Sequence, residues 1–283
     1  MALDRDDHAL HELDEIARPS HAWSPPVQPL RPLPAYCIAC SLHETCRPGC
    51  HNGADGAGGP RLASTNRMIL RGESLFRGGD LFRSLYIIRS GCFKTVQSLE
   101  GGRDQVTGFY MGGDMLGFEG ICSGAHRCDA VALEDSNVCV IPYARLETLE
   151  HAGGGVMLAV LKAMSAEIVQ ERRVMLLLGL RSAEERLANF LVALSQRLLA
   201  RGYSPSEFNL RMTRRDIGSF LGLKFETVSR IFSRFRDEGL IDVKLRHVRI
   251  QDLAGLRRLA NVEADALLPL QAGARNPLLM QLE

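Results

Sequence analysis

The spacing of apolar residues divides the chain into a region of short strands followed by a region of helices. Between residues 67 and 142, short apolar runs alternate with glycine-containing turns such as RGGD (77–80) and MGGD (111–114). Many short strands with glycine corners predict an antiparallel barrel or roll. The predicted strands are residues 84–91, 92–99, 105–111, 129–135 and 138–142.

From about Gly155 the apolar spacing becomes that of a helix. A series of residues follows at steps of 3, 4, 3, 4 and 3, which is the spacing of a coiled-coil seam: Leu161, Met164, Ile168, Glu171, Met175 and Leu178. A seam this regular favours a helix that pairs in parallel with a second copy of the chain. A helix packed only on its own domain is the alternative.

The C-terminal third predicts a helix-turn-helix. Ser182 and Glu185 form a capping box that opens one helix, and Thr213 can cap a second, short one. Residues 221–223, with Gly222 at the centre, supply a tight turn. The next helix, which ends near Gly239, has four apolar residues at helical spacing for its inner face: Val228, Ile231, Phe232 and Phe235. Residues 240–252 then alternate like a two-stranded wing.

Charge is distributed unevenly along a chain that is almost neutral, with 34 Lys and Arg against 33 Asp and Glu. Residues 209–250 hold ten basic and five acidic residues, a local net charge of 10 − 5 = +5. A basic face inside a neutral chain indicates a domain directed at phosphate. The sequence therefore predicts binding of double-stranded DNA through this helix-turn-helix.

Groove chemistry assigns roles to the polar residues of the second helix. Arg230 can donate two hydrogen bonds to guanine, and Glu226 can accept one from cytosine, with Ser229 on the same outer face. Arg214 and Arg215, at the start of the first helix, are expected to contact phosphates, which position a protein without specifying sequence.

The chain has eight cysteines and an acidic N-terminus without the basic and apolar segments of a signal peptide. No apolar run reaches the length of about 18 residues that suggests a membrane span. We therefore expect a cytoplasmic protein without a membrane partner. Reduced thiols there are more often ligands, redox groups or small buried hydrophobic residues than disulfides.

Four cysteines fall within fourteen residues near the N-terminus. Cys37-x2-Cys40-x5-Cys46 can surround an iron–sulfur cluster. A zinc site completed by a nearby Cys or His is an equal alternative from spacing alone. Residues 1–36 contain six of the twelve prolines and are expected to be an unstructured extension.

Three segments together resemble the CRP/FNR superfamily and, within it, the oxygen-responsive FNR regulators. They are CIACSLHETC (37–46), LLLGLRSAEERLANFLVALSQR (176–197) and MTRRDIGSFLGLKFETVSRIFSRF (212–235). The likeness covers about Tyr36 to Gln251. It implies an α+β fold with an antiparallel β-roll of the cyclic-nucleotide-binding kind, a long dimerisation helix and a C-terminal winged helix-turn-helix.

The domain boundaries that we expect follow from this pattern. They are an extension at 1–36, a cysteine-rich lead and linker at 37–60, a β-roll sensor domain at 61–150, a dimerisation helix at 151–181, a DNA-binding domain at 182–253 and a tail at 254–283.

The resemblance also implies the sensing chemistry. It identifies Cys139, just before an Ile-Pro pair, as the fourth ligand, so that Cys37, Cys40, Cys46 and Cys139 would hold a [4Fe–4S] cluster. The implied function is that of an oxygen-responsive regulator and activator. It would bind an operator similar to TTGAT-N4-ATCAA as a homodimer, read it through Glu226, Ser229 and Arg230, and contact RNA polymerase.

By the same likeness, Glu171 is an acidic residue on the dimer seam, together with Met164, Ile168 and Met175. Two carboxylates that approach across the dyad weaken the dimer, and cluster binding would offset that cost. The chain departs from the family pattern at Thr45 beside Cys46, at Arg103 in a loop that contacts RNA polymerase, and at Lys224, the N-cap of the recognition helix.

Other classes are less well supported by the sequence. A cyclic-nucleotide sensor on the same fold needs an Arg–Ser/Thr pair, whereas residues 127–129 are Arg, Cys and Asp. A haem or thiol-redox sensor, or a zinc protein, is the remaining alternative on this fold. The sequence has no catalytic grouping or phosphate-binding loop of an enzyme, so we expect that the protein is not an enzyme.

Overall fold

The computed structural model describes residues 65–99, 101–150 and 156–261. The extension at 1–36 and the cysteine-rich segment at 37–60, with Cys37, Cys40 and Cys46, lie outside these residues. So do residues 151–155 and most of the expected C-terminal tail.

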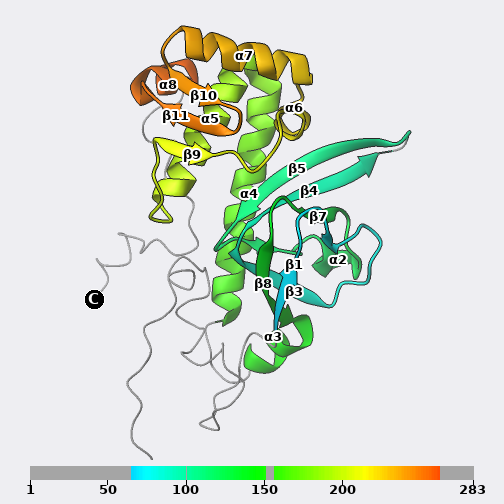
Figure 1. Ribbon diagram of the computed structural model, residues 1–283. Coiled ribbons are helices and arrows are strands. Elements are labelled where there is room, and N and C mark those ends of the chain that lie inside the picture. Colours follow the sequence, from blue (N-terminus) through cyan, green and yellow to red (C-terminus); the bar gives the residue numbers. More distant parts are fainter. Residues whose placement is uncertain (1–64, 100, 151–155, 262–283) are drawn as a thin grey trace, which may run out of the picture. The chain divides into compact units, whose positions relative to one another are not determined.

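Two four-stranded antiparallel sheets form the first described domain (Figure 1). One has the order β1-β8-β3-β6, and the other has the order β2-β7-β4-β5. The strands are β1 (Thr65–Ile69), β2 (Ser74–Phe76), β3 (Ser84–Ser90), β4 (Cys92–Leu99), β5 (Arg103–Met111), β6 (Met115–Leu116), β7 (Asp129–Ala132) and β8 (Ser136–Pro142).

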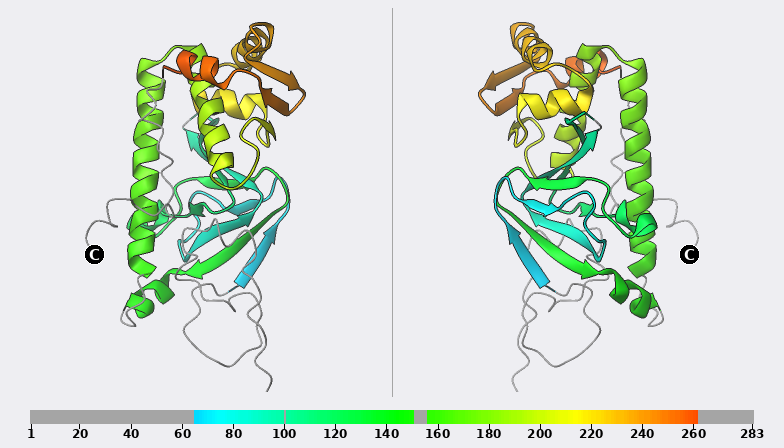
Figure 2. Two further views of the ribbon diagram at one scale, coloured as in Figure 1. Left: turned by 90° about the vertical axis from the view of Figure 1, so that its left-hand side faces the viewer. Right: turned by 90° about the vertical axis from the view of Figure 1, so that its right-hand side faces the viewer.

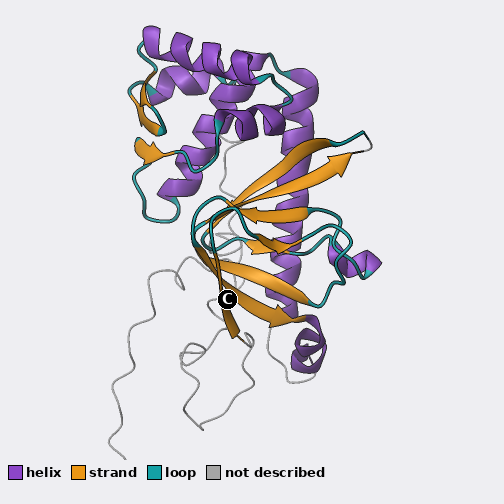
Figure 3. Ribbon diagram, turned by 45° about the vertical axis from the view of Figure 1, so that its right-hand side comes forward, coloured by secondary structure: helices purple, strands orange, loops and turns teal. Residues whose placement is uncertain are grey.

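The five strands expected from the sequence are present as β3, β4, β5, β7 and β8. Glycines in the two predicted turns have the positive φ that such turns need, at 93° for Gly79 and 94° for Gly113. The chain also forms three short strands that the pattern did not show, β1, β2 and β6. Strands β4 and β5 pair along their whole length as a long hairpin, drawn in orange in Figure 3.

Three of the described helices follow or interrupt the strands of this domain, and the longest runs beside them. After the short α2 (Gly120–Ser123) and strand β8, α3 (Tyr143–Glu150) leads to α4 (Val156–Leu180), the long helix seen from two sides in Figure 2. Val160 and Ala163 of α4 are buried in one apolar cluster with Leu85, Ile141 and Leu146. One side of α4 therefore belongs to the core of the β-domain.

The second described domain follows α4 and combines helices with a small sheet. The elements are α5 (Ala183–Leu199), β9 (Glu207–Asn209), α6 (Arg214–Leu221), α7 (Phe225–Asp237), β10 (Ile241–Lys244), β11 (His247–Ile250) and α8 (Leu253–Leu259). The capping box at the start of α5 is present, since Ser182 accepts a hydrogen bond from Glu185 N and its own N–H donates to the Glu185 carboxylate.

The second domain extends beyond residue 253, where the sequence predicted its end. Asp252 caps α8 by accepting a hydrogen bond from Gly255 N at 2.8 Å. Leu256 and Ala260 are fully buried in the same cluster as Leu187 and Phe235. Helix α8 is therefore part of the DNA-binding domain's core rather than of a tail.

Candidate DNA interface and cysteine site

A tight turn joins α6 to α7. Gly222 has a left-handed φ of 64°, and Leu223 N donates to Gly218 O at 2.8 Å. A Cβ atom at Gly218 would lie 2.6 Å from Leu223 O, which is closer than packing allows. These two glycines let the helices meet at the angle of a helix-turn-helix, as expected from residues 221–223.

A reciprocal pair of hydrogen bonds begins α6. Thr213 Oγ1 accepts from Asp216 N at 3.1 Å, and Thr213 N donates to the Asp216 carboxylate at 2.9 Å. This capping box satisfies backbone donors that a helix start leaves free. It fixes the first helix of the unit, as the sequence predicted for Thr213.

The inner face of α7 is buried as predicted. Val228 and Phe235 are 0% exposed, and Phe232 and Ile231 are 2% and 6% exposed. These four side chains pack into one cluster with Leu187, Leu191 and Ile217. The burial sets the rotation of α7 about its axis, and with it the residues that face outward.

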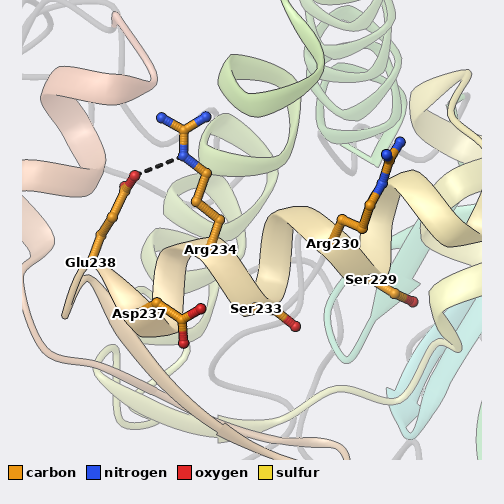
Figure 4. Close-up of a pocket in the computed structure, with 6 residues that line it drawn as sticks. All are labelled: Ser229, Arg230, Ser233, Arg234, Asp237 and Glu238. Atoms are coloured by element: carbon orange, nitrogen blue, oxygen red, sulfur yellow. Dashed lines mark hydrogen bonds and ion pairs between the residues drawn. The ribbon is translucent and has the colours of Figure 1, made fainter.

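The outer face of α7 carries the three residues predicted to read bases. Glu226 and Arg230 are exposed, and Ser229 is half-buried. Among the residues that the structure describes, no side chain forms an ion pair with Glu226 or Arg230. An open hollow runs along this side of the helix, lined by Ser229, Arg230, Ser233, Arg234, Asp237 and Glu238 (Figure 4).

Arg234 differs from Arg230, although both lie on the same helix. Its Nε donates to Glu238 at 2.7 Å, and its guanidinium also pairs with Glu184. These carboxylates raise the pKa of Arg234, with the Glu238 hydrogen bond the largest cause. Within the described part of the chain, Arg230 is therefore the arginine of α7 that has no acidic partner and can offer its donors to a base edge.

Arg214 and Arg215, the two expected phosphate contacts, occupy different environments at the start of α6. Arg215 is exposed. The guanidinium carbon of Arg214 lies 3.1 Å from the centre of the Phe232 ring, and burial lowers the pKa of Arg214 to about 10. Its buried Nη1 has no hydrogen-bond partner among the described residues. Arg214 therefore remains charged at neutral pH, and its Nη1 is available to donate a hydrogen bond.

The wing expected after α7 is present and has a third strand. Strands β10 and β11 pair from Ile241–Ile250 to Lys244–His247, with Leu245 in a left-handed conformation at the tip. Strand β9 adds to the other edge of β11. Arg249 donates to Glu207 of β9 at 3.3 Å, so part of the wing's charge is paired within the domain.

The expected seam residues of α4 divide between two sides of the helix. Leu161, Ile168 and Met175 are 53%, 47% and 71% exposed. Glu171 is also exposed, whereas Met164 is half-buried against the β-domain cluster. An apolar line with a spacing of seven residues therefore remains uncovered in the single chain.

Cys139 is the expected cluster ligand that the structure describes. It lies in β8, is 8% exposed, and is the register partner of Asn66 in β1. Its Sγ lies 3.6 Å from Asn66 Oδ1. Strand β1 is the first described element, and its Thr65 and Asn66 lie opposite Val140 and Cys139.

The corner that would hold a cyclic phosphate carries an acid. The carboxylate of Asp129 accepts a hydrogen bond from Gly78 N at 2.8 Å, an N–H that would otherwise be free for an anion. Burial raises the pKa of the neighbouring Cys128 thiol to about 12, so this thiol is neutral. Arg127 donates to Ser123 Oγ at 3.1 Å. This corner does not favour an anionic ligand.

Phe225, the first residue of α7, was missed by the sequence reasoning. It is 50% exposed and lies directly before Glu226. Spacing gave no signal for it, because Phe225 precedes Val228 by three residues and Phe232 by seven, which is the spacing of the inner face.

A β-domain, a long helix with an uncovered apolar line and a winged helix-turn-helix together define a DNA-binding transcription regulator. The comparison with protein families agrees. Residues 67–151 match the cyclic nucleotide-binding domain, and residues 185–259 match the Crp-like helix-turn-helix domain.

Curated relatives identify the family. The chain is 40% identical over 232 residues to the transcriptional activator protein FnrA of Stutzerimonas stutzeri, which covers 82% of this chain and 95% of the relative. It is 40% identical over 225 residues to the fumarate and nitrate reduction regulatory protein of Escherichia coli K12, covering 80% and 90%. The chain belongs to the CRP/FNR family of transcription regulators, which are not enzymes.

Solved structures have the same fold. FixK2 from Bradyrhizobium japonicum superposes with a TM-score of 0.66 at 28% identity, covering 72% of this chain and all of that one. A CRP-family regulator from Thermus thermophilus superposes with a TM-score of 0.56 at 22% identity, covering 71% and 99%. No helix in the described ranges is long and apolar enough to cross a membrane.

Proposed function

We propose that this protein is an oxygen-responsive transcription regulator that binds a palindromic operator as a homodimer when Cys37, Cys40, Cys46 and Cys139 hold a [4Fe–4S] cluster. The position of Cys139 is the observation that carries the proposal. Its buried thiol lies opposite Asn66 of β1, which is the described strand nearest in sequence to the three N-terminal cysteines.

Chain length is compatible with this ligand set. Asn66 follows Cys46 by 66 − 46 = 20 positions in the chain, and an extended chain of that length spans up to about 70 Å. The three N-terminal cysteines can therefore approach Cys139 without any change in the sheet. The thiolate donors fit an iron–sulfur cluster, which when bound supplies a centre that oxygen can break up.

Dimerisation is the proposed link between the cluster and DNA. Leu161, Ile168 and Met175 form the apolar line of α4 that a second copy would cover. Glu171 lies exposed on the same helix, and its partner's carboxylate would approach it across the dyad. Like charges weaken such a pairing, so cluster binding has to stabilise the dimer for it to form.

Operator reading follows from the free donors and acceptors of α7. In this proposal Arg230 donates to guanine, Glu226 accepts from cytosine and Ser229 contacts a neighbouring base, in a site similar to TTGAT-N4-ATCAA. Arg214 and Arg215 contact phosphates. Two recognition helices about 34 Å apart match the two half-sites of a palindrome. A bound dimer would then contact RNA polymerase to activate transcription.

Anaerobic purification followed by iron and sulfide analysis tests the cluster. We expect four iron and four sulfide per chain, a visible absorbance band that bleaches in air, and operator binding that is lost with it. Cys139→Ala should abolish the band. Cys92→Ala is the matched control, because Cys92 is also a buried β-strand cysteine whose pKa is raised to about 12 by burial. Stoichiometric zinc, or an unchanged spectrum in Cys139→Ala, would refute the proposal.

Glu171 provides a separate test of the charge mechanism. Glu171→Ala and Glu171→Gln should both dimerise and bind the operator in air, because each removes the negative charge. Glu171→Asp keeps the charge and should remain a monomer in air. Variants that all stay monomeric without the cluster would show that repulsion at Glu171 does not control pairing.

A further inference from the structure

Phe225 is a large apolar side chain that lies outside the buried cluster of its domain. It is 50% exposed at the first position of α7. The base of the helix is already sealed by its neighbours, since Val228 is fully buried and Leu223 packs against the same cluster. Phe225 itself is not among the residues of that cluster, and no other ring in the described chain stacks on it.

The side chain lies among the residues that we propose to read the operator. Phe225 directly precedes Glu226, and Ser229 is one helical turn further on the same side. Side chains of a helix lean toward its N-terminus, so the Phe225 ring extends beyond the start of α7. The first residues of a recognition helix are those that contact base edges in the major groove.

Only one base presents an apolar group there. Thymine carries a C5 methyl in the major groove, and apolar side chains such as phenylalanine contact it, whereas cytosine, guanine and adenine offer only polar edges. A half-exposed phenyl ring held against a polar edge would remove water from groups that it cannot replace.

We propose that Phe225 contacts the methyl group of a thymine in each operator half-site and makes the protein select a thymine–adenine pair next to the pair that Glu226 contacts. This inference rests on the operator reading in the proposed function and adds a residue to it. It does not depend on which cofactor controls dimerisation.

The test begins with selection of the preferred operator from random duplex DNA, using the full chain purified anaerobically. Each thymine of the selected palindrome is then replaced by deoxyuridine, which lacks the methyl, in both half-sites together. Dissociation constants are measured by fluorescence anisotropy for the wild type and for Phe225→Ala. Leu245→Ala is the control, because it removes an exposed apolar side chain from the wing tip instead.

One thymine position should stand out for the wild type. Burial of one methyl group corresponds to about fourfold in affinity, and so to about 15-fold for two half-sites. Phe225→Ala should bind the thymine and deoxyuridine duplexes equally, and Leu245→Ala should discriminate as the wild type does. Phe225→Leu, which keeps an apolar side chain, should retain part of the discrimination.

Two results would overturn the assignment. A wild type that is indifferent to deoxyuridine at every position has no methyl contact, and discrimination that persists in Phe225→Ala belongs to another residue. A wild type that selects no palindrome at all would overturn the operator reading by Glu226, Ser229 and Arg230 as well, so the two failures are distinguishable. Melting curves confirm folding, since a half-exposed residue outside the core should leave the melting temperature nearly unchanged.

Discussion

Replacement of Ile168 by alanine tests the uncovered apolar line of α4. Ile168 is 47% exposed in the single chain and lies seven residues from Leu161 and from Met175, which are also exposed. Side chains at this spacing meet their counterparts when two helices pair. The Ile168→Ala change therefore removes apolar surface that only a dimer would bury.

The expected magnitude follows from the exposure of Ile168. Full burial of an isoleucine side chain contributes about 1.5–3 kcal/mol, and roughly half of it remains to be gained per chain. Two chains contribute to one dimer, and alanine keeps about a quarter of the side-chain carbons. The dimer should lose about 1–2 kcal/mol, which weakens the dimerisation constant by about 5- to 30-fold.

Sedimentation velocity over a range of concentrations measures this constant. The wild type and Ile168→Ala are compared under nitrogen, and again in air with Glu171→Ala present in both. In the second comparison dimerisation does not require the cluster, so an effect of Ile168→Ala on cluster binding cannot change the result. Leu199→Ala is the matched control, because Leu199 is 59% exposed and lies in α5 rather than in α4.

A change of less than about twofold in the dimerisation constant of Ile168→Ala would show that Ile168 is not buried between two α4 helices, because burial predicts a larger change. An equal effect of Leu199→Ala would also contradict a role of this apolar line, since loss of any exposed aliphatic side chain would then be sufficient. Circular dichroism at the concentrations used checks that α4 remains helical in each variant.

Three further predictions concern stability. Phe235→Ala removes a fully buried ring and should cost about 3–5 kcal/mol of unfolding free energy in urea titrations, whereas Phe235→Leu should cost less. Thr213→Ala breaks the capping box of α6 and should cost about 1 kcal/mol, with Thr213→Ser near the wild type. Burial raises the pKa of Glu167 above 4.5, so the folded state holds this proton more tightly than the unfolded state. Its contribution to stability is therefore complete below pH 4.5 and is lost as pH rises through the raised pKa. Glu167→Gln should gain stability relative to the wild type over that window in thermal melts of the air-exposed protein, and a difference that does not vary with pH would contradict this.

The helix-turn-helix was predictable because its signals are local. The Thr213 cap, the turn at Gly222 and the buried side of α7 each depend on residues within about one helical turn. Strand β9 gave no such signal, because its three residues are strand only through their pairing with β11. Helix α8 did have a local signal, because Asp252 is a typical N-cap residue. The boundary predicted at residue 253 did not take this signal into account.

The β-domain was predictable strand by strand but not as a pair of sheets. Alternation and glycine turns identify β3, β4 and β5. The partners of β8 are distant in the chain, since its Cys139 lies opposite both Asn66 and Ile87. Pairings over such separations depend on the packing of the whole domain. The pairing of Cys139 with Asn66 therefore could not be predicted from the spacing of residues along the chain.

Packing, and not spacing along the chain, decides which of the acidic residues Glu167 and Glu171 of α4 is exposed. Glu167 and Glu171 lie one turn apart, and side chains at this spacing lie on the same side of a helix. Glu167 accepts a hydrogen bond from the buried Tyr110 hydroxyl at 2.6 Å, while burial raises the pKa of both groups. That contact, with Val160 and Ala163 in the β-domain cluster, fixes the rotation of α4. Glu171 is exposed, so it is the carboxylate of the two that is available to a charge mechanism for dimerisation.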